Sequence, residues 1–225
     1  MGWKLAVVVV PLEERALADV VSEIYQRRET LSRTEVDMLQ ALNPSRGQRY
    51  AIAHDRFAWI CDWKVVERSF KSPLAVHTAH SFMLLSTVNS YGFATARDGK
   101  FLRNRQGEAD NGITVDIGTP TECERALVSR DAKPGQEDAA WQAWTNAEKT
   151  FDTQHEITDA QGIRQTVIFD AITHDSIGES IVLGLMGELV GFRFDVDSPA
   201  LEAFWAAPVM RLEPAKRSIF GWLAR

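Results

Sequence analysis

The apolar run LAVVVV at residues 5–10 limits the fold of this chain more than any other feature. Valine is β-branched and favours extended backbone, so residues 4–10 predict a strand. A strand without alternating polar residues has no face for water and must be covered on both sides. The run is also too short to span a membrane or to form the core of a secretion signal. We therefore expect a buried strand in a cytoplasmic protein with no stable membrane insertion.

An amphipathic helix is predicted directly after this strand. Pro11 suits the first position of a helix. The apolar residues that follow recur at helical spacing: Leu12, Ala16, Leu17, Val20, Val21, Ile24 and Tyr25. Charged residues fall on the opposite side, so this helix is expected to pack against the first strand.

The remaining pattern predicts an α+β fold. Asp98-Gly99 is expected to form a tight hairpin turn, and Asp62 is expected to cap a short helix through Phe70. Strict strand–helix alternation is absent, so we expect a mixed, mostly antiparallel sheet flanked by helices, with a mainly helical C-terminal portion. The predicted strands lie at 49–54, 56–61, 91–97, 101–105, 113–117 and 165–169, and the later helices at 137–149, 176–190 and 199–206.

The 225 residues are expected to form a single α+β domain over 1–225. If the chain is subdivided, the segment RDAKPGQED at 130–138 separates a sheet-rich core at 1–129 from a helical portion at 136–225. The final stretch, PAKRSIFGWLAR, is net positive and has apolar residues at helical spacing. It is suited to dock on its own domain, on a partner or on a membrane surface.

Composition argues against several functional classes. The chain has 25 Lys and Arg against 31 Asp and Glu, a formal net charge of −6, which argues against general nucleic-acid binding. No glycine-rich phosphate loop and no G-x-S-x-G motif occurs, and no cofactor is expected. Cys61 and Cys123 lack C-x-x-C spacing, which predicts free thiols in a reducing compartment. The basic residues of the predicted hairpin are expected to form a solvated surface: Arg97, Lys100, Arg103 and Arg105.

Two histidines, His77 and His80, stand three residues apart in the stretch LAVHTAHSFMLLS. In a helix they would share a face and could ligate one metal ion or flank one substrate. In a strand they would point to opposite faces. Periodicity does not decide between the two. Buried histidines with hydrogen-bonded ring nitrogens are the structural alternative to a metal or acid–base role.

Cys61 and Asp62 stand together at the end of the strand predicted at 56–61. A cysteine at this place, near the start of a helix, would have a lowered pKa and could act as a nucleophile with a histidine as its base. The alternative is that Cys61 is a small, buried apolar residue.

Four motifs occur in order along the chain: ALNPSRGQRYAIAHDRFAWICDW at 41–63, His77-x-x-His80-Ser81, Asp98-Gly99 with Arg103, and DIGTP at 116–120. Together they resemble an uncharacterised bacterial family that is common in actinomycetes, a domain of unknown function. The resemblance covers about residues 4–124 and matches the rest of the chain poorly. It departs from the family at 82–84, where Phe-Met-Leu replaces a stretch with an acidic residue. The resemblance implies no activity, but it groups Cys61, Asp62, His77, His80 and Ser81 and implies a strand at 74–78.

Two functional hypotheses follow. The first is a non-catalytic binding protein that contacts a protein partner through an aromatic surface, because catalytic motifs are absent and the chain has 7 tryptophans. The second is a hydrolase-type enzyme, with or without a divalent metal. In that enzyme His77 or His80 would be the general base, and Cys61 the nucleophile or a spectator beside Asp62. The sequence does not fix the substrate or the oligomeric state.

Overall fold

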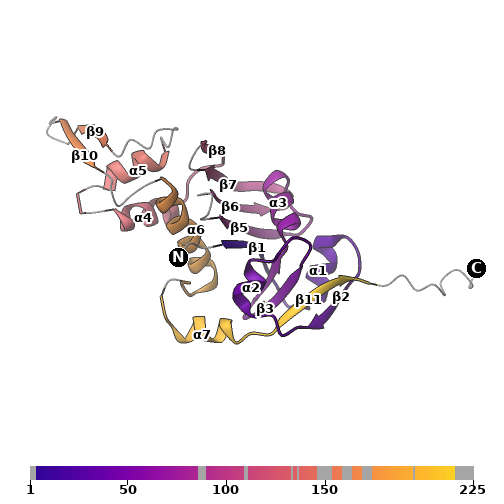
Figure 1. Ribbon diagram of the computed structural model, residues 1–225. Coiled ribbons are helices and arrows are strands. Elements are labelled where there is room, and N and C mark those ends of the chain that lie inside the picture. The colour runs from indigo at the N-terminus through magenta and orange to yellow at the C-terminus, as the bar shows by residue number, and fades with distance from the viewer. Residues whose placement is uncertain are drawn as a thin grey trace, which may run out of the picture.

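A nine-stranded antiparallel sheet forms the middle of the protein, with helices on both of its faces (Figure 1). The computed structural model describes residues 4–85, 90–108, 111–132, 134–135, 137–145, 154–158, 164–168, 174–194 and 196–215. The strands are β1 (Lys4–Pro11), β2 (Glu29–Arg33), β3 (Tyr50–His54), β4 (Phe57–Cys61), β5 (Thr78–Leu85), β6 (Ser90–Arg97), β7 (Lys100–Glu108), β8 (Gly112–Ile117), β9 (Gln154–Thr158), β10 (Arg164–Ile168) and β11 (Val209–Pro214). The helices are α1 (Leu17–Tyr25), α2 (Met38–Leu42), α3 (Trp63–Lys71), α4 (Glu122–Asp131), α5 (Glu137–Thr145), α6 (His174–Val190) and α7 (Pro199–Trp205).

The strand predicted from LAVVVV is the central strand β1. The sheet order is β2-β11-β3-β4-β1-β5-β6-β7-β8, and β9 and β10 form a separate hairpin. On β1, Val9 lies opposite Trp59 of β4 and His80 of β5. Every residue from Leu5 to Val10 is buried. The prediction of a strand covered on both faces is therefore confirmed.

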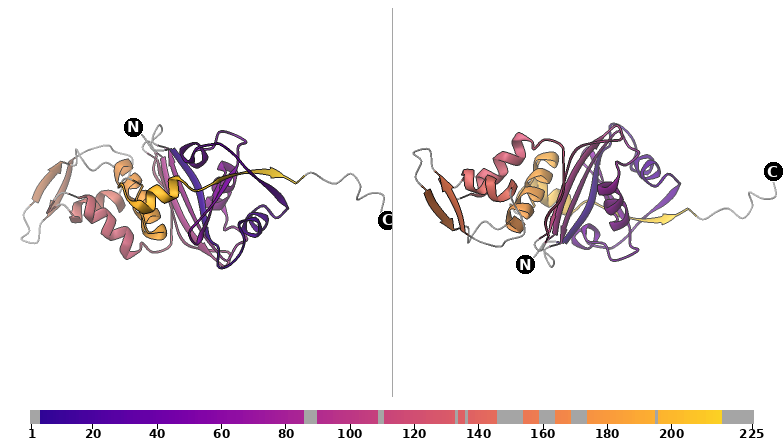
Figure 2. Two further views of the ribbon diagram at one scale, coloured as in Figure 1. Left: turned by 90° about the horizontal axis from the view of Figure 1, so that it is seen from below. Right: turned by 90° about the horizontal axis from the view of Figure 1, so that it is seen from above.

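Each face of the sheet has its own apolar core. Val7 and Val9 belong to the core that also contains side chains of α2, α4, α5, α6 and α7. Val8 and Val10 belong to the core shared with α1 and α3. Figure 2 shows the sheet nearly edge-on, with α4 to α7 on one side and α1 and α3 on the other. The predicted α+β class with its antiparallel sheet is confirmed.

The last described strand, β11, returns to the sheet and lies between β2 and β3. Met210 of β11 lies opposite Arg33 on one side and Ala51 on the other. Residues late in the chain therefore complete the sheet that the first hundred residues build. The predicted division into two portions stays a prediction, but the main sheet contains strands from both sides of it.

Several element boundaries differ from the sequence-based expectation. Pro11 ends β1 and does not begin a helix, because Glu13 and Glu14 adopt positive φ angles of 47° and 68°. Helix α1 therefore begins only at Leu17. Strands β2, β9 and β11 and helix α4 were not predicted, and α4 extends into the expected linker at 130–138. No helix within the described residues is long and apolar enough to cross a membrane.

An aromatic cluster fastens α7 to the sheet. Phe204 of α7 is fully buried, and its ring centroid lies 4.6 Å from that of Trp59 on β4 and 5.3 Å from that of His54 on β3. Phe192 and Phe194, from the segment that joins α6 to α7, pack against the same ring. The C-terminal helix is thus part of the main core.

We predict that Phe204→Ala lowers the free energy of unfolding by about 3–5 kcal/mol, because it opens a cavity in this cluster. Leu39→Ala is the control, since Leu39 is 60% exposed on α2, and its effect should stay within about 0.5 kcal/mol. Urea denaturation followed by tryptophan fluorescence measures both. Equal effects of the two substitutions would contradict the docking of α7.

Candidate functional site

His77 and His80 do not share a face. Strand β5 runs from Thr78 to Leu85, so His80 lies on a strand as one interpretation expected. His77 precedes the strand, and the strand implied at 74–78 is wrong in its bounds. The exposed His77 places its Nδ1 atom 2.6 Å from Oδ1 of Asp98, in the turn between β6 and β7. The backbone carbonyl of His77 accepts a hydrogen bond from the Asp98 amide at 2.9 Å. His77 therefore stabilises the hairpin turn between β6 and β7 through its side chain and its backbone.

His80 lies within the sheet, on the face covered by α6 and α7. Its Nδ1 atom is 3.2 Å from the Thr95 hydroxyl on the neighbouring strand. Burial, with a smaller contribution from the Arg97 charge, lowers the pKa of His80 to about 4. The imidazole is therefore neutral at pH 7, and it is a weak base for proton abstraction.

Cys61 and Asp62 each have a structural partner. Cys61 is fully buried, and burial raises the pKa of its thiol far above the ordinary value, with a further contribution from Asp62. Asp62 caps α3 by accepting a hydrogen bond from the Lys64 amide at 2.9 Å. Its other oxygen accepts one from the Tyr25 hydroxyl at 2.8 Å. The predicted cap is confirmed, and Cys61 is held as a thiol.

The structure does not bring the thiol and the imidazoles together. Strand β1 separates β4 from β5, and His80 is level with Trp59, two residues before Cys61. Two strand spacings and a two-residue offset place the Cα atoms of Cys61 and His80 about 12 Å apart. Among the described residues, no three His, Cys, Asp or Glu side chains are grouped so that they could hold a metal ion. The catalytic roles of His77, His80, Cys61 and Asp62 stay predictions.

A buried ionic cluster joins β7 to α4, and it was not predicted from the sequence. The Arg103 guanidinium donates to both Glu124 carboxylate oxygens, at 2.9 and 2.8 Å. The side chains of Arg103 and Glu124 are 4% and 0% exposed. Arg103 also binds Asp116 of β8 and the carbonyl oxygens of Ile117 and Gly118. We call the set of Arg103, Arg105, Asp116, Glu124 and Trp144 the ionic clasp.

Arg105 completes the ionic clasp from the next inward position of β7. It donates to Asp116 Oδ2 at 2.8 Å and to the carbonyl of Trp144. Its guanidinium carbon lies 4.2 Å from the centroid of the Trp144 ring, a cation–π contact. The expectation that the hairpin arginines are solvated is wrong for Arg103 and Arg105. The available signal was their spacing, because residues two apart in a strand share a face.

Strand β8 is the last strand of the sheet, and among the described strands it pairs with β7 alone (Figure 1). Val115 lies opposite Gln106 and Ile113 opposite Gly107, so a bulge interrupts the simple alternation predicted for 113–117. Ile117 remains 44% exposed. After it the chain turns at Gly118, which has φ +85° and lies so close to the Leu102 carbonyl that a Cβ would clash there.

Exposed apolar side chains gather at this edge. Within the described residues, large apolar side chains are strongly exposed at four places: Leu39, Leu102, Ile117 and Val196. Ile117 of β8 lies opposite Asn104 of β7, two residues along the strand from Leu102, and Gly118 lies against the Leu102 carbonyl. We call the free side of β8 together with Leu102 and Ile117 the β8 edge.

The tryptophans in the described part of the chain belong to the cores. Trp59 and Trp144 are fully buried. Others pack against a core while remaining partly buried: Trp63, Trp141 and Trp205. Trp3, Trp222 and the basic tail from residue 216 lie outside the described residues. The exposed apolar side chains of the described part are therefore aliphatic, and the aromatic surface that was expected is not found among them.

Comparison with known proteins gives a family without a known activity. The model of DUF6928, described as a family of unknown function, matches residues 9–143. This range contains β8, Cys61, His77, His80 and every residue of the ionic clasp except Trp144. No curated protein and no solved structure matches the chain.

We predict that Arg103→Met destabilises the protein by about 3–5 kcal/mol, because Glu124 would stay buried without its cationic partner. Lys100→Met, at an exposed position of the same strand, should change stability by less than about 0.5 kcal/mol. Chemical denaturation of both variants and of Arg103→Met/Glu124→Met tests the pair. The double variant should be more stable than the single one, and additive losses would contradict a coupled ion pair.

The neutral state of His80 can be tested by titration. Because its pKa is lowered in the folded protein, the stabilisation it contributes is present above about pH 6.5 and is lost as the pH falls towards 4. NMR of the histidine ring protons, with His80→Gln to assign the signal, should give a midpoint near pH 4. A midpoint between 6 and 7 would show that the ring is solvated.

Proposed function

The chain belongs to DUF6928, and we propose that it is a non-catalytic binding protein whose β8 edge pairs with an extended segment of a protein partner. The observation that carries the proposal is the position of β8 at the end of the sheet, with no described strand on its outer side. An edge strand presents backbone donors and acceptors that another extended chain can pair with.

The side chains around the edge support an apolar component of binding. Leu102 and Ile117 are 49% and 44% exposed, and Val115 of β8 is half-buried. Natural edge strands are commonly protected by lysine or proline, and β8 carries neither in its sequence GITVDI. A bound strand with apolar residues at alternate positions would cover this surface.

The ionic clasp supports a rigid binding edge. Asp116 of β8 is held by both arginines, and the carbonyl of Ile117 accepts from Arg103 at 3.1 Å. A strand that is already ordered loses little conformational entropy when a partner pairs with it. Glu124 on α4 binds Arg103, and Arg103 binds Asp116, so α4 helps to fix the position of β8.

The separate environments of the four candidate catalytic residues support a role without catalysis. His80 is neutral and weakly basic, and Cys61 is a buried thiol. His77 pairs with Asp98, and Asp62 caps a helix. We also propose that the protein is bacterial and cytoplasmic. The family resemblance supports the first statement, and the free cysteines Cys61 and Cys123 support the second.

We predict that peptides selected from a displayed random library against the wild-type protein lose at least about tenfold in affinity for Leu102→Lys/Ile117→Lys. Lysine at the edge removes the apolar contact and disfavours strand addition. Leu39→Lys is the control, because it makes the same leucine-to-lysine change at a position on α2 that is 60% exposed, and its affinity for the peptides should stay within about twofold. Fluorescence anisotropy with labelled peptides measures all three proteins.

Two results would contradict the proposal. One is equal binding of the selected peptides to the edge variant and to the Leu39 control. The other is turnover of generic ester, phosphate or amide substrates by the purified protein that is lost in His77→Ala.

A further inference from the structure

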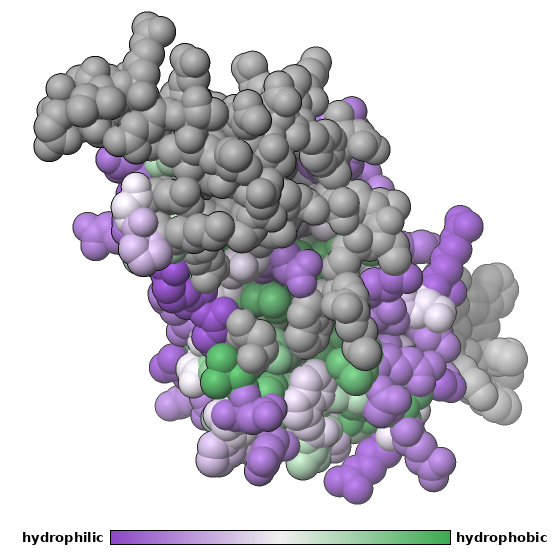
Figure 3. All heavy atoms as spheres, turned by 60° about the vertical axis from the view of Figure 1, so that its left-hand side comes forward, coloured by the Kyte–Doolittle hydropathy of each residue, from purple (hydrophilic) through white to green (hydrophobic). Residues whose placement is uncertain are grey.

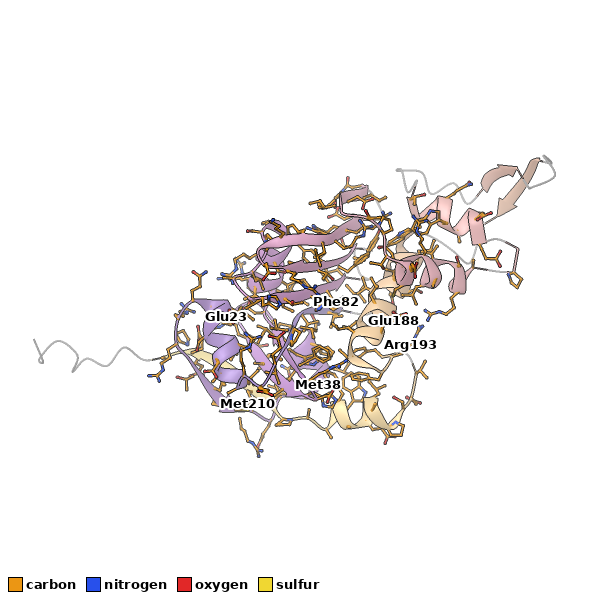
Figure 4. All side chains as sticks on the ribbon, turned by 180° about the vertical axis from the view of Figure 1, so that it is seen from behind. Glu23, Met38, Phe82, Glu188, Arg193 and Met210 are labelled. Atoms are coloured by element: carbon orange, nitrogen blue, oxygen red, sulfur yellow. The ribbon has the colours of Figure 1, made fainter. Side chains whose placement is uncertain are left out.

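The sheet has a second free edge at β2. Strands β2 and β8 stand first and last in the nine-stranded sheet, and no described strand lies outside either of them. Figure 4 labels Met210 of β11, which lies opposite Arg33 of β2 and marks that end of the sheet. We propose that the β8 edge pairs with the β2 edge of a second copy of this chain. The proposal rests on the function proposed above and names the partner strand.

The two edges carry opposite charges. Arg28 stands directly before β2 and Arg33 is its last residue, and both are exposed. Glu108 ends β7 just before β8, and the exposed Glu122 lies in the first turn of α4, just after β8. Within the described part of the chain, none of these four side chains forms an ion pair, unlike the carboxylates of the ionic clasp. Both pairs of charges are therefore available to a partner.

These charges decide which edges can meet. Two β8 edges would bring carboxylates together, and two β2 edges would bring guanidinium groups together. Charged side chains commonly protect free strands from pairing, but they repel only an edge of the same sign. Each strand has a charge at both ends, and the strands are five and six residues long. A β2 edge beside a β8 edge therefore places opposite charges together at both ends.

The apolar side chains of the two edges lie on the same face of the sheet. Ile117 of β8 lies opposite Asn104, whose side chain donates to the Phe70 carbonyl of α3 at 2.9 Å. Because residues directly opposite each other share a face, Ile117 lies on the face covered by α1 and α3. Leu31 of β2 packs against the apolar core of that same face. The two edges can therefore join their apolar sides without turning one sheet over.

The direction of the strands fits this arrangement. All neighbours in the nine-stranded sheet are antiparallel, so the first and ninth strands point the same way. A second copy that continues the sheet without turning over pairs its β2 parallel to β8. Each copy then keeps one unused edge of each kind. Such a head-to-tail contact does not close on itself and gives an open assembly.

Sedimentation velocity of the full chain tests the proposal. The weight-average sedimentation coefficient should keep rising over about a hundredfold increase in protein concentration, without levelling off at a dimer. Raising the NaCl concentration from about 50 mM to about 500 mM should weaken association at least about tenfold, because salt screens exposed charges.

Charge reversal tests each edge in turn. Arg28→Glu/Arg33→Glu should stay monomeric, because both of its edges are acidic. Glu108→Lys/Glu122→Lys should also stay monomeric, because both of its edges are basic. An equimolar mixture of the two variants should assemble again, since each offers the other an edge of opposite charge. Recovery in the mixture also shows that both variants are folded.

Arg46→Glu/Arg56→Glu is the matched control for the β2 variant. It makes the same change of charge at two exposed positions in the turns on either side of β3, away from both edges. Its association constant should stay within about twofold of wild type, because single exposed charges far from a contact contribute little.

Association through another surface would give a different result. Figure 3 shows the helical side, where apolar side chains gather among polar ones. An assembly formed there would survive both edge variants, and that result, or a plateau at a dimer, would overturn the inference. A chain that stays monomeric at every concentration would also overturn it. Binding of selected peptides by such a monomer would leave the function proposed for the β8 edge in place.

Discussion

Burial of β1 on both faces is the constraint on which the other elements depend. Its valines alternate between the two cores, so neither face of the sheet centre can be left to water. Helices α1 and α3 cover one face, and α2 with the later helices covers the other. The C-terminal half is therefore needed to complete the core: α6 and α7 shield the face that carries Val7, Val9 and Trp59.

The ionic clasp has a different role at the far end of the sheet. There the interface between β7, β8 and α4 contains two buried arginines with their carboxylate partners instead of apolar side chains alone. Buried charges of this kind require matched geometry, so they fix which way α4 sits and where β8 lies. The order of the β8 edge, which the proposed function uses, follows from this geometry.

The fold could be predicted from sequence where local signals are strong. The valine run, the Asp98-Gly99 turn and the Asp62 cap each depend on nearby residues, and all three are confirmed. Strands β2 and β11 have mixed sequences, ETLSR and VMRLEP, and become strands by pairing with each other across the length of the chain. No local pattern indicates such a pairing.

The candidate site shows the same limit. The sequence identified residues able to do chemistry. It did not show that β1 lies between the strands of Cys61 and His80, because that depends on the order of strands in the sheet. Likewise, the sequence predicts Arg103 and Arg105 as surface charges, whereas in the fold they bind carboxylates of α4 and β8. Side-chain type was readable from the sequence, whereas partners distant along the chain were not.

The central claim is that β8 is a rigid edge that a partner strand extends. Hydrogen–deuterium exchange of the wild-type protein, with and without a selected peptide, tests it most directly. The account predicts slower exchange on binding over residues 112–117, the segment of β8. Protection confined to another part of the chain, with exchange over 112–117 unchanged, would contradict it.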